Sequence, residues 1–481
     1  MSENNPKPVS LLAPESTGGD IATTGFGFQD AVLMAKLPRF LAEDGFTAVI
    51  REAVCDFEAS FFSVEGGVRR EGFEAKDYLI TPATFWAEID TFAGVDATDD
   101  TAYGGFTLVS TGLSDKVEPV VNGLRRARDP YPFYPPSSGI LHASFAEFEK
   151  RVVSHGKPES MARLLFDKVR IEPNWSLAHD EGKALFASAM HEHHPWSLSC
   201  SGRDLQECYW KLRALVLARK NRPVQRHEIE SAIESALPRG AIPTTPVRLH
   251  TASAPEDRAP PGAIVARWER FSGEGTRSFP PPEEWRSSII LPLQAFRAWV
   301  DGEKRPRRVR LSGKRRLSTL LAIGFSLPAV EGFAIEMEVG NVVWATDAHP
   351  DGDTPVYQLD SRLTAGSGER LVVTLGIIRE VVEDVTLYAA RAGAGGCPRL
   401  DLRGTSAIVT DKQLNLVVRS VKDEISKALQ QTSASAVDLF IAGPAPLALF
   451  LGHRMNAVAP VRCFEWVRKG EYTPTCELGG S

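Results

Sequence analysis

Two carboxylates and a lysine are spaced so that they could hydrolyse a phosphodiester bond. Glu74 and Lys76 lie two residues apart, so in a β-strand both side chains project from one face. Asp56 precedes them, and Glu65-Gly66-Gly67 can form a hairpin loop that brings Asp56 to the same face. Two oxygen anions can hold Mg²⁺ or Mn²⁺ against a phosphate while the lysine positions or deprotonates the attacking water. The pattern predicts metal-dependent phosphodiester hydrolysis.

These residues resemble the D-(x)n-(D/E)-x-K core of restriction-endonuclease-like nucleases, over roughly residues 18–130. The upstream Gly25-Phe26-Gly27-Phe28-Gln29 and Glu52-x-x-x-Asp56 resemble the form found in bacterial anti-phage effector nucleases. The chain has Cys55-Asp56 where related chains often carry an acidic pair, and Glu74 where they often carry Gln, which leaves the number of metal ions open. The resemblance implies that Asp56 and Glu74 are metal ligands and that Lys76 is the catalytic lysine. It also implies that Glu52 and Gln29 are supporting residues.

A structural role is the alternative interpretation of this motif, because Glu-x-Lys on a strand is often a solvated cross-strand charge pair. The order of the surrounding elements favours the nuclease. Apolar periodicity and turn residues predict an α/β domain with a small mixed sheet. Its expected helices are 28–41, with Pro38 as a kink or early end, 83–92 and 116–128, and its expected strands are 47–54, 56–63, 72–80 and 105–110.

A second set of residues could bind phosphate. Eight basic residues lie between Lys304 and Arg316, and Leu311–Ser318 is placed where a strand turns into a helix. Such a turn presents backbone N–H groups and the positive end of the helix dipole. A counterpart occurs at Ile441–Ala445, where glycine ends a strand and proline opens a helix. Two facing cradles would fit a ligand with several phosphates, such as a cyclic oligonucleotide.

Strands and helices alternate along the region that carries these two turns, which is typical of a parallel, doubly wound sheet with its ligand beyond the carboxyl ends of the strands. Both halves start with a strand, a turn and a helix, which suggests a diverged duplication of Rossmann-like units. The expected elements are 308–312, 315–326, 333–339, 342–345, 371–377, 379–391, 399–402, 411–431, 437–443, 445–456 and 461–467.

This region, about residues 250–481, resembles the SAVED domain of bacterial cyclic-oligonucleotide anti-phage (CBASS) systems, a fusion of two CARF-like units. The similar segments are Ser312–Ser318, Arg379–Val385, Asp438–Ala445 and Phe464-Glu465-Trp466. The resemblance implies a receptor for a cyclic tri- or tetranucleotide messenger whose binding assembles protomers and activates a fused effector. By this correspondence Lys314, Arg316 and Ser318 would hold phosphate or ribose, and Gly443 and Pro444 would line the second rim. Trp344, near the end of an expected strand, could stack a base, with a core or surface position as the alternative.

Composition shifts divide the chain. Prolines are dense between Pro238 and Gly262, which predicts a semi-rigid linker. The expected organisation is a flexible tail at 1–17, an endonuclease domain at 18–237 with a helical insert or connector at 144–237, a linker at 238–262 and a SAVED sensor domain at 263–481.

Length and charge exclude several classes of protein. The chain has 481 residues, 43% of them apolar, so wholesale disorder is excluded. No apolar stretch reaches the roughly 20 residues that span a bilayer, and the N-terminus lacks the features of a secretory signal, which predicts a cytoplasmic protein. The six scattered cysteines predict reduced thiols without structural zinc. A net charge of −6 gives no overall attraction to nucleic acid, so DNA must meet local basic patches.

Together these patterns predict a cyclic-oligonucleotide-activated endonuclease for double-stranded DNA, which oligomerises because two strands need two sites. Two alternatives remain open: a sensor fused to a non-catalytic adaptor, and a constitutive restriction nuclease whose C-terminal region reads DNA. The basic residues expected to hold DNA are Arg125, Arg126, Arg128, Arg219, Lys220 and Arg222.

Overall fold

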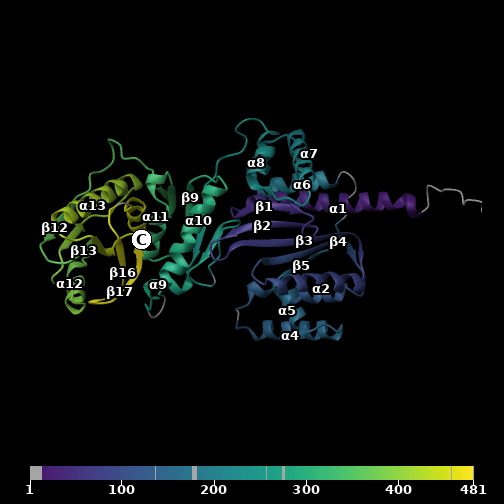
Figure 1. Ribbon diagram of the computed structural model, residues 1–481, viewed down its shortest axis with the longest axis horizontal. Coiled ribbons are helices and arrows are strands. Elements are labelled where there is room, and N and C mark those ends of the chain that lie inside the picture. The colour runs from purple at the N-terminus through teal and green to yellow at the C-terminus, as the bar shows by residue number, and fades with distance from the viewer. Residues whose placement is uncertain are drawn as a thin grey trace, which may run out of the picture. The chain divides into compact units, whose positions relative to one another are not determined.

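The computed structural model describes residues 14–135, 137–175, 181–255, 257–273, 277–456 and 458–479, with side chains from residue 27 onward (Figure 1). The chain divides into two compact units. Unit 1 contains the residues up to Phe62 and Val68–Pro243; unit 2 contains Ser63–Gly67 and the residues from Thr244. The boundary falls at Pro243, inside the stretch predicted as a linker.

Unit 1 is built on a six-stranded mixed sheet with the strand order β5-β4-β3-β2-β1-β6. The strands β3, β4 and β5 are parallel, and β1 pairs antiparallel with β2 and β6. A turn at Val64–Gly66 joins β2 to β3, as predicted from the two glycines. The bounds are β1 (Phe46–Arg51), β2 (Phe57–Ser63), β3 (Gly67–Ile80), β4 (Tyr103–Leu113), β5 (Val169–Glu172) and β6 (Val224–Gln225).

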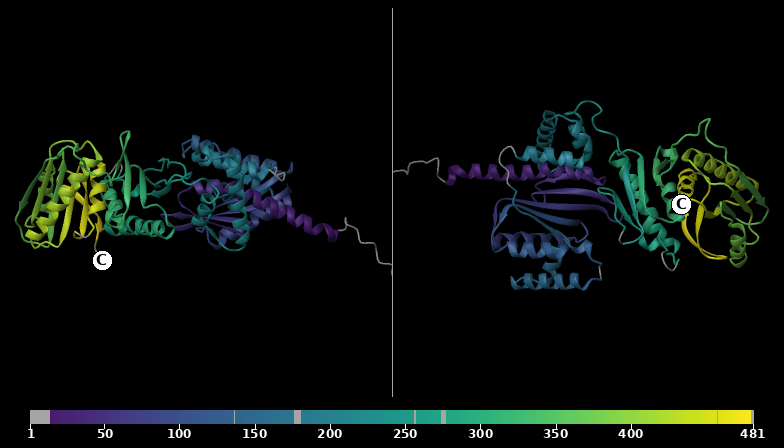
Figure 2. Two further views of the ribbon diagram at one scale, coloured as in Figure 1. Left: turned by 90° about the horizontal axis from the view of Figure 1, so that it is seen from above. Right: turned by 180° about the vertical axis from the view of Figure 1, so that it is seen from behind.

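Helices cover both faces of this sheet, as Figures 1 and 2 show. One face forms a core with α1 (Pro14–Ala42), α6 (Glu181–His193), α7 (Gly202–Ala218) and α8 (Arg226–Glu234), and this core includes Phe73 and Ala75 of β3. The other face forms a second core, which includes Cys55 and residues of α2 (Pro82–Thr98), α3 (Glu118–Arg128), α4 (Gly139–Ser154) and α5 (Glu159–Asp167). The strand alternation therefore sorts β3 side chains between two different helical layers.

Three local expectations for unit 1 differ from the structure. The first helix begins at Pro14, within the stretch predicted as a tail, and it continues through Pro38 to Ala42. Residues 144–237 are mostly helical but include β5 and β6, which form the two edges of the sheet. This segment is therefore part of the fold and not an insert, because its helices complete both cores.

Unit 2 contains two mixed sheets, with the orders β11-β10-β9-β7-β8 and β12-β14-β13-β15-β16-β17. Within each sheet the inner strands are parallel, and the antiparallel strands β11, β12 and β17 lie at edges. The strand bounds are β7 (Val247–Ala252), β8 (Ile264–Arg267), β9 (Arg308–Gly313), β10 (Ala334–Val339), β11 (Val342–Ala345), β12 (Leu359–Thr364), β13 (Arg370–Ile377), β14 (Arg399–Gly404), β15 (Ala436–Ala442), β16 (Val461–Arg468) and β17 (Glu471–Leu478).

Two helices, α11 and α14, join the sheets of unit 2 through a backbone-to-backbone crossing. A Cβ on Gly324 of α11 would lie 2.1 Å from the Leu449 carbonyl oxygen, and one on Gly452 of α14 would lie 2.2 Å from the Leu321 carbonyl oxygen. Glycine at both positions is what permits this approach. The helix bounds are α9 (Pro282–Trp285), α10 (Leu291–Gly302), α11 (Leu317–Ser326), α12 (Val382–Arg391), α13 (Asp411–Gln431) and α14 (Ala445–Arg454).

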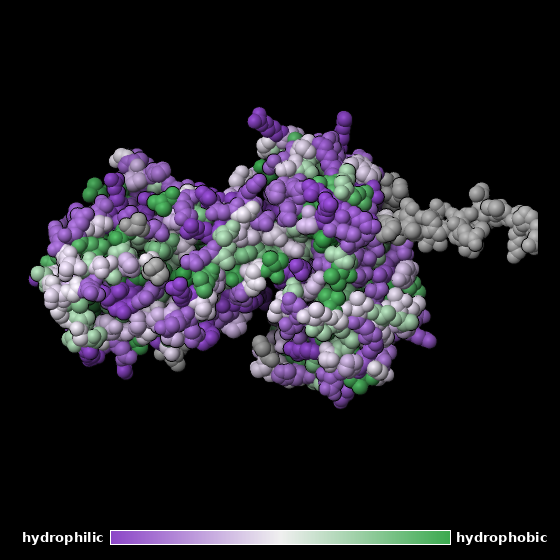
Figure 3. Space-filling model, in the orientation of Figure 1, coloured by the Kyte–Doolittle hydropathy of each residue, from purple (hydrophilic) through white to green (hydrophobic). Residues whose placement is uncertain are grey.

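The predicted alternation of strand and helix in unit 2 is confirmed for the elements from β9 onward that lie inside its sheets, but four strands were missed. Strand β7 lies inside the predicted linker, because the prolines of that stretch flank the strand instead of interrupting it. The edge strands β8, β12 and β17 were also missed. Polar and apolar residues are interspersed on the face seen in Figure 3. Among the described residues, no helix is long and apolar enough to cross a membrane.

Candidate functional sites

The residues predicted to cut a phosphodiester meet on the α2 side of β3. Lys76 Nζ lies 2.9 Å from Glu74 Oε2. The backbone N–H of Ala75 donates to Asp56 Oδ2 at 2.8 Å, which fixes that carboxylate beside the strand. A fourth group, Glu88 of α2, places its Oε1 3.1 Å from Lys76 Nζ. The structure therefore brings together two predicted carboxylates, the predicted lysine and one carboxylate that the sequence analysis missed.

Alternation along β3 explains this placement. Phe73 and Ala75 are buried against the α1 layer, so Glu74 and Lys76 face the α2 layer. Helix α2 starts at the N-cap Thr81 and buries Phe85 and Ile89 against the sheet. Glu88 lies three residues after Phe85, on the side of the helix that faces the strand. An acid next to the apolar stripe of a helix is the signal that could have identified it.

Burial and neighbouring charges shift the proton affinities in this cluster. Burial, together with the negative charge of Asp56, raises the pKa of Glu74 to about 7. Burial alone would lower the pKa of Lys76, but its hydrogen bond and ion pair with Glu74 outweigh that effect and raise the pKa well above the usual range. Lys76 is consequently a firmly protonated cation, suited to positioning and charge stabilisation.

The cluster fits a divalent metal of the Mg²⁺ type. The described residues contain no group of three or more His, Cys, Asp or Glu side chains that could hold a metal ion. A site here would therefore rest on two protein carboxylates. Mg²⁺ commonly takes only one or two protein carboxylates and completes its shell with water and substrate phosphate. Asp56 and the buried Glu74 supply such a pair of hard oxygen donors, and no nitrogen or sulfur donor is needed.

The two predicted supporting residues have other neighbours. Glu52 has a left-handed backbone, with φ 54°, and its carboxylate contacts Arg51 at 2.9 Å and Lys220 at 2.6 Å. The backbone N–H of Glu52 donates to the Asp56 carbonyl, so the turn is close to the cluster even though its side chain is held by cations. The Gln29 side-chain oxygen is buried without a hydrogen-bond partner. No described contact joins Gln29 or the Glu52 carboxylate to Glu74 or Lys76.

Several residues predicted to hold DNA are engaged within the protein. Arg125 and Arg128 donate to the backbone carbonyls of β5 residues Ile171 and Val169, at 3.3 and 2.6 Å. Arg219 contacts Glu228 at 2.5 Å, and Lys220 is the residue that pairs with Glu52. Arg126 and Arg222 are exposed. A role of these six residues in DNA binding stays a prediction.

Unit 2 contains a cavity of about 580 Å³ where the carboxyl ends of β13 and β15 meet the start of α11. This size is typical of small-ligand sites. Its position agrees with the rule that ligands of parallel sheets bind beyond the strand ends. Trp466 and the carboxylates Glu380, Asp384 and Glu465 line it. Four arginines also line it: Arg277, Arg315, Arg316 and Arg379.

Arg315 is the cation in this cavity that most needs an anionic partner. Its Nη2 donates to the Gly313 carbonyl at 2.5 Å, but its Nε and Nη1 are buried without hydrogen-bond partners. Burial lowers the pKa of Arg315 to about 10. A buried cation without a counter-charge is unfavourable, so an anionic ligand would be stabilised here.

An aromatic platform lies beside these cations. The guanidinium groups of Arg277 and Arg379 lie 4.2 and 5.5 Å from the centre of the Trp466 ring. The Trp466 indole N–H donates to Asp384 Oδ2 at 2.7 Å, which orients the ring. The backbone at Ile378 is left-handed, with φ 69°, between the lining residues Ile377 and Arg379. Aromatic rings and cations together suit a ligand with both bases and phosphates.

The predicted sensor residues separate into two groups. Arg316 and Gly443 line the cavity. Lys314, Ser318, Trp344 and Pro444 are not among the lining residues, and their predicted roles receive no support from this cavity. Trp344 is only 8% exposed, and the Ser318 N–H donates to Glu465 Oε1 at 2.9 Å, beneath the cavity wall.

Gly313, the last residue of β9, packs its backbone closely against β7. Its φ is +90°, and a Cβ there would lie 2.2 Å from the Thr251 carbonyl oxygen. The residue that approaches Gly313 is therefore on β7, a strand that the sequence analysis did not anticipate.

The raised pKa of Glu74 predicts a pH-dependent stability in metal-free protein. Because the folded pKa is about 7 and the ordinary value is 4.5, the stability that Glu74 contributes is present below pH 4.5 and is lost as the pH rises through 7. Glu74→Gln cannot ionise, so its melting temperature relative to the wild type should rise by about 2–5 °C between pH 5 and pH 8 in EDTA. Equal differences at both pH values would contradict the burial of an ionisable carboxyl.

Comparison with known proteins identifies the sensor half first. Residues 292–478 match the SAVED family, described as the SMODS-associated and fused to various effectors sensor domain. This matched region contains α11, α14 and most residues that line the cavity. Unit 2 thus carries a SAVED sensor domain.

Relatives of this chain match along its whole length. CD-NTase-associated protein 4 from Moraxella osloensis and that from an Acinetobacter strain are each 25% identical over 474 residues, covering 98% of this chain and 99% of the relative. The solved Moraxella osloensis Cap4 receptor has a TM-score of 0.77 at 24% identity, covering 95% of this chain and 100% of the other. The Acinetobacter baumannii Cap4 receptor with 3'3'3'-cAAA has a TM-score of 0.80 at 23% identity, with coverages of 94% and 98%.

The family match lies within unit 2, and the matches to the relatives extend across both units. The chain is Cap4-like: it is homologous along its full length to CD-NTase-associated protein 4, at 25% identity, and its residues 292–478 carry a SAVED sensor domain. Its fold is a mixed α/β architecture of the Cap4 type, built on three mixed sheets.

Proposed function

We propose that this protein is a cyclic-oligonucleotide-activated, metal-dependent endonuclease that cuts double-stranded DNA as an anti-phage effector. The observation that carries the proposal is the cluster on β3, where Lys76 contacts Glu74 at 2.9 Å and Asp56 is held beside them by the Ala75 N–H. Its convergence favours an enzyme over a non-catalytic adaptor. Unit 1, in this proposal, is a restriction-endonuclease-like domain.

Asp56 and Glu74 are the proposed metal ligands. A bound Mg²⁺ or Mn²⁺ would supply Lewis-acid stabilisation of the phosphate and a nucleophile at neutral pH. Of the two carboxyls, Glu74 must lose its proton before it can bind a cation, because burial raises its pKa to about 7. Asp56 is anchored to β3 by the hydrogen bond that the Ala75 N–H donates.

Lys76 is the proposed catalytic cation. Glu74 and Glu88 both contact its Nζ, at 2.9 and 3.1 Å, so the ammonium is held from two sides. Its raised pKa favours positioning the attacking water and stabilising charge on phosphorus over proton abstraction. Glu88 acts as a positioning residue that keeps Lys76 aimed along the strand.

The activating ligand is proposed to be a cyclic trinucleotide bound in the cavity of unit 2. The solved Acinetobacter baumannii relatives hold 3'3'3'-cAAA and 2'3'3'-cAAA. In this chain the buried, unpartnered nitrogens of Arg315 suit a phosphate, and Trp466 with its flanking arginines suits a base. Ligand-induced assembly of protomers would supply one nuclease site for each DNA strand. The cytoplasm is the proposed location.

The test is a plasmid-cleavage assay of the purified protein with Mg²⁺ and a panel of cyclic di-, tri- and tetranucleotides. Degradation is expected only with a cyclic trinucleotide and Mg²⁺ together, and EDTA should stop it. Cleavage without any nucleotide would identify a constitutive nuclease. Nucleotide binding without cleavage under any metal condition would identify an adaptor.

A further inference from the structure

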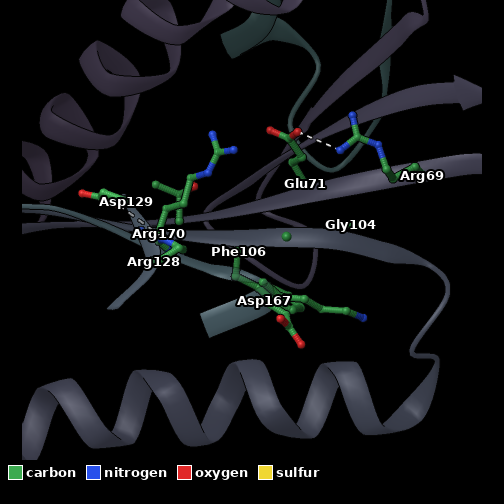
Figure 4. A pocket seen from close by; sticks show the side chains of 11 residues that line it. Arg69, Glu71, Gly104, Phe106, Arg128, Asp129, Asp167 and Arg170 are labelled. Carbon is green, nitrogen blue, oxygen red and sulfur yellow. Dashed lines mark hydrogen bonds and ion pairs between the residues drawn. The ribbon is translucent and has the colours of Figure 1, made fainter. Parts of the chain in front are cut away.

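A second pocket, separate from the cavity of unit 2, lies in unit 1, and one of the arginines that line it has no described side-chain hydrogen bond or ion pair. The pocket has a volume of about 370 Å³ and is lined by residues of β3, β4 and β5 and by the ends of α3 and α5. Figure 4 shows Arg128 and Arg170 together on one side of it and the ion pair of Arg69 with Glu71 on the other. Gly104 and Gly105 form part of its wall, where they contribute no side chain.

This pocket is separate from the cluster around Lys76. Glu71 pairs with Gly105 across β3 and β4, and Thr107 pairs with Arg170 across β4 and β5. Because side chains alternate, Glu71 and Arg170 belong to the sheet face that also carries Phe73 and Ala75. Glu74 and Lys76 project from the opposite face, so a ligand in this pocket would not be the phosphate that is cut.

Two of the three carboxylates that line the pocket, Glu71 and Asp167, are paired with arginines, and the third, Asp129, lies at its solvent-exposed side. Glu71 contacts Arg39 at 2.7 Å and Arg69 at 3.1 Å. Asp167 contacts Arg163 at 2.7 Å. Lys168, another lining residue, is likewise satisfied by an acid on α2, 2.6 Å away. Across the described ranges of the chain, the Arg170 guanidinium makes neither a hydrogen bond nor an ion pair within contact distance, although its charge acts on Glu43, and the side chain is exposed.

Arg128 lies next to Arg170, and its positive charge is only partly compensated by a neighbouring carboxylate. Its guanidinium donates to the Val169 carbonyl at 2.6 Å and lies 3.7 Å from Asp129. Burial and the positive charge of Arg170 lower the pKa of Arg128. Two neighbouring cations disfavour each other, and an anion between them would remove that repulsion. Guanidinium groups also match the oxygen geometry of phosphate better than an ammonium does.

We infer that this pocket binds a phosphate-type oxyanion through Arg128 and Arg170. The anion is a phosphate monoester of a small nucleotide or a phosphodiester of DNA outside the cleavage site. The second source rests on the proposed function, because it requires DNA as the substrate. The first source does not.

Arg170→Ala tests the inference, because the side chain is exposed and its loss leaves the core intact. The matched control is Arg203→Ala, an exposed arginine on α7 that does not line the pocket. Calorimetric titration with inorganic phosphate and deoxyadenosine 5′-monophosphate measures small anions. A small-phosphate site is supported if Arg170→Ala lowers the affinity for one of these two anions by at least about tenfold while Arg203→Ala does not.

Anisotropy of a labelled 20-base-pair duplex in EDTA, at several salt concentrations, measures the DNA source. If DNA occupies the pocket, Arg170→Ala should weaken binding and make the slope of log affinity against log salt less negative by about 1, relative to Arg203→Ala. The inference is overturned if both variants behave alike with every probe. Because no cleavage is measured, failure of the proposed nuclease activity would appear separately, in the plasmid assay of the wild type.

Discussion

Lys76→Met is expected to lower messenger-dependent plasmid cleavage by about 10²–10³-fold or more, since it removes the cation held between Glu74 and Glu88. Methionine keeps the length and apolar stem of the lysine, so packing against α2 is retained. The measurement is the initial rate of plasmid cleavage at saturating cyclic trinucleotide and Mg²⁺. Binding of the trinucleotide, measured by calorimetry, should not change, because unit 2 contains the whole proposed cavity.

Lys157→Met is the matched control for this prediction. Lys157 also contacts a carboxylate of α2, at 2.6 Å from Asp90, but it lies outside the cluster on β3. Its loss should leave the cleavage rate within about twofold of the wild type, as expected for an exposed ion pair. Cleavage by Lys76→Met at the wild-type rate would remove Lys76 from the mechanism.

Arg315→Ala is expected to combine two opposite effects. Affinity for 3'3'3'-cAAA and 2'3'3'-cAAA should fall by at least about tenfold, because a charge-assisted contact to phosphate is lost. The melting temperature of the ligand-free protein should stay equal or rise, because the guanidinium is buried with two unpartnered nitrogens. Calorimetry and thermal unfolding measure the two effects on the same preparation.

A charge-matched control for Arg315→Ala is Lys427→Ala, which removes an exposed cation from α13. It should leave trinucleotide affinity unchanged. Wild-type affinity in Arg315→Ala would show that this residue does not contact the ligand. Failure of the wild-type protein to bind either trinucleotide would instead contradict the proposed ligand.

Periodicity in the sequence predicted the inner elements of unit 2 well. The helix expected over 411–431 has those bounds in the structure, because its apolar stripe and its Thr410 cap are both local signals. Strand β12 carries no such signal, since most of its residues are exposed and polar at a sheet edge. Strand β17 includes Pro474, a residue tolerated at edges but contrary to the usual strand pattern.

In the candidate sites, too, positions set by one strand or hairpin were predictable from the sequence, and positions set by tertiary packing were not. The Glu74–Lys76 pair follows from the two-residue period of one strand, and a short hairpin supplies Asp56. Glu88 reaches the cluster only because α2 packs across the sheet, which no single-strand pattern reveals. The cavity of unit 2 combines residues from four strands and two helices, so the places of Trp466 and Arg315 within it could not be assigned from their own segments alone.

The glycine crossing of α11 and α14 has a mechanical consequence for the sensor. With no side chain between the two backbones, neither helix can slide or roll without colliding with the carbonyl groups of the other. Arg316 stands at the start of α11 and Gly443 two residues before α14, so both rims of the cavity are attached to this crossing. If a ligand displaces one rim of the cavity, α11 and α14 are therefore expected to move together. The two sheets of unit 2 should then shift as one rigid body.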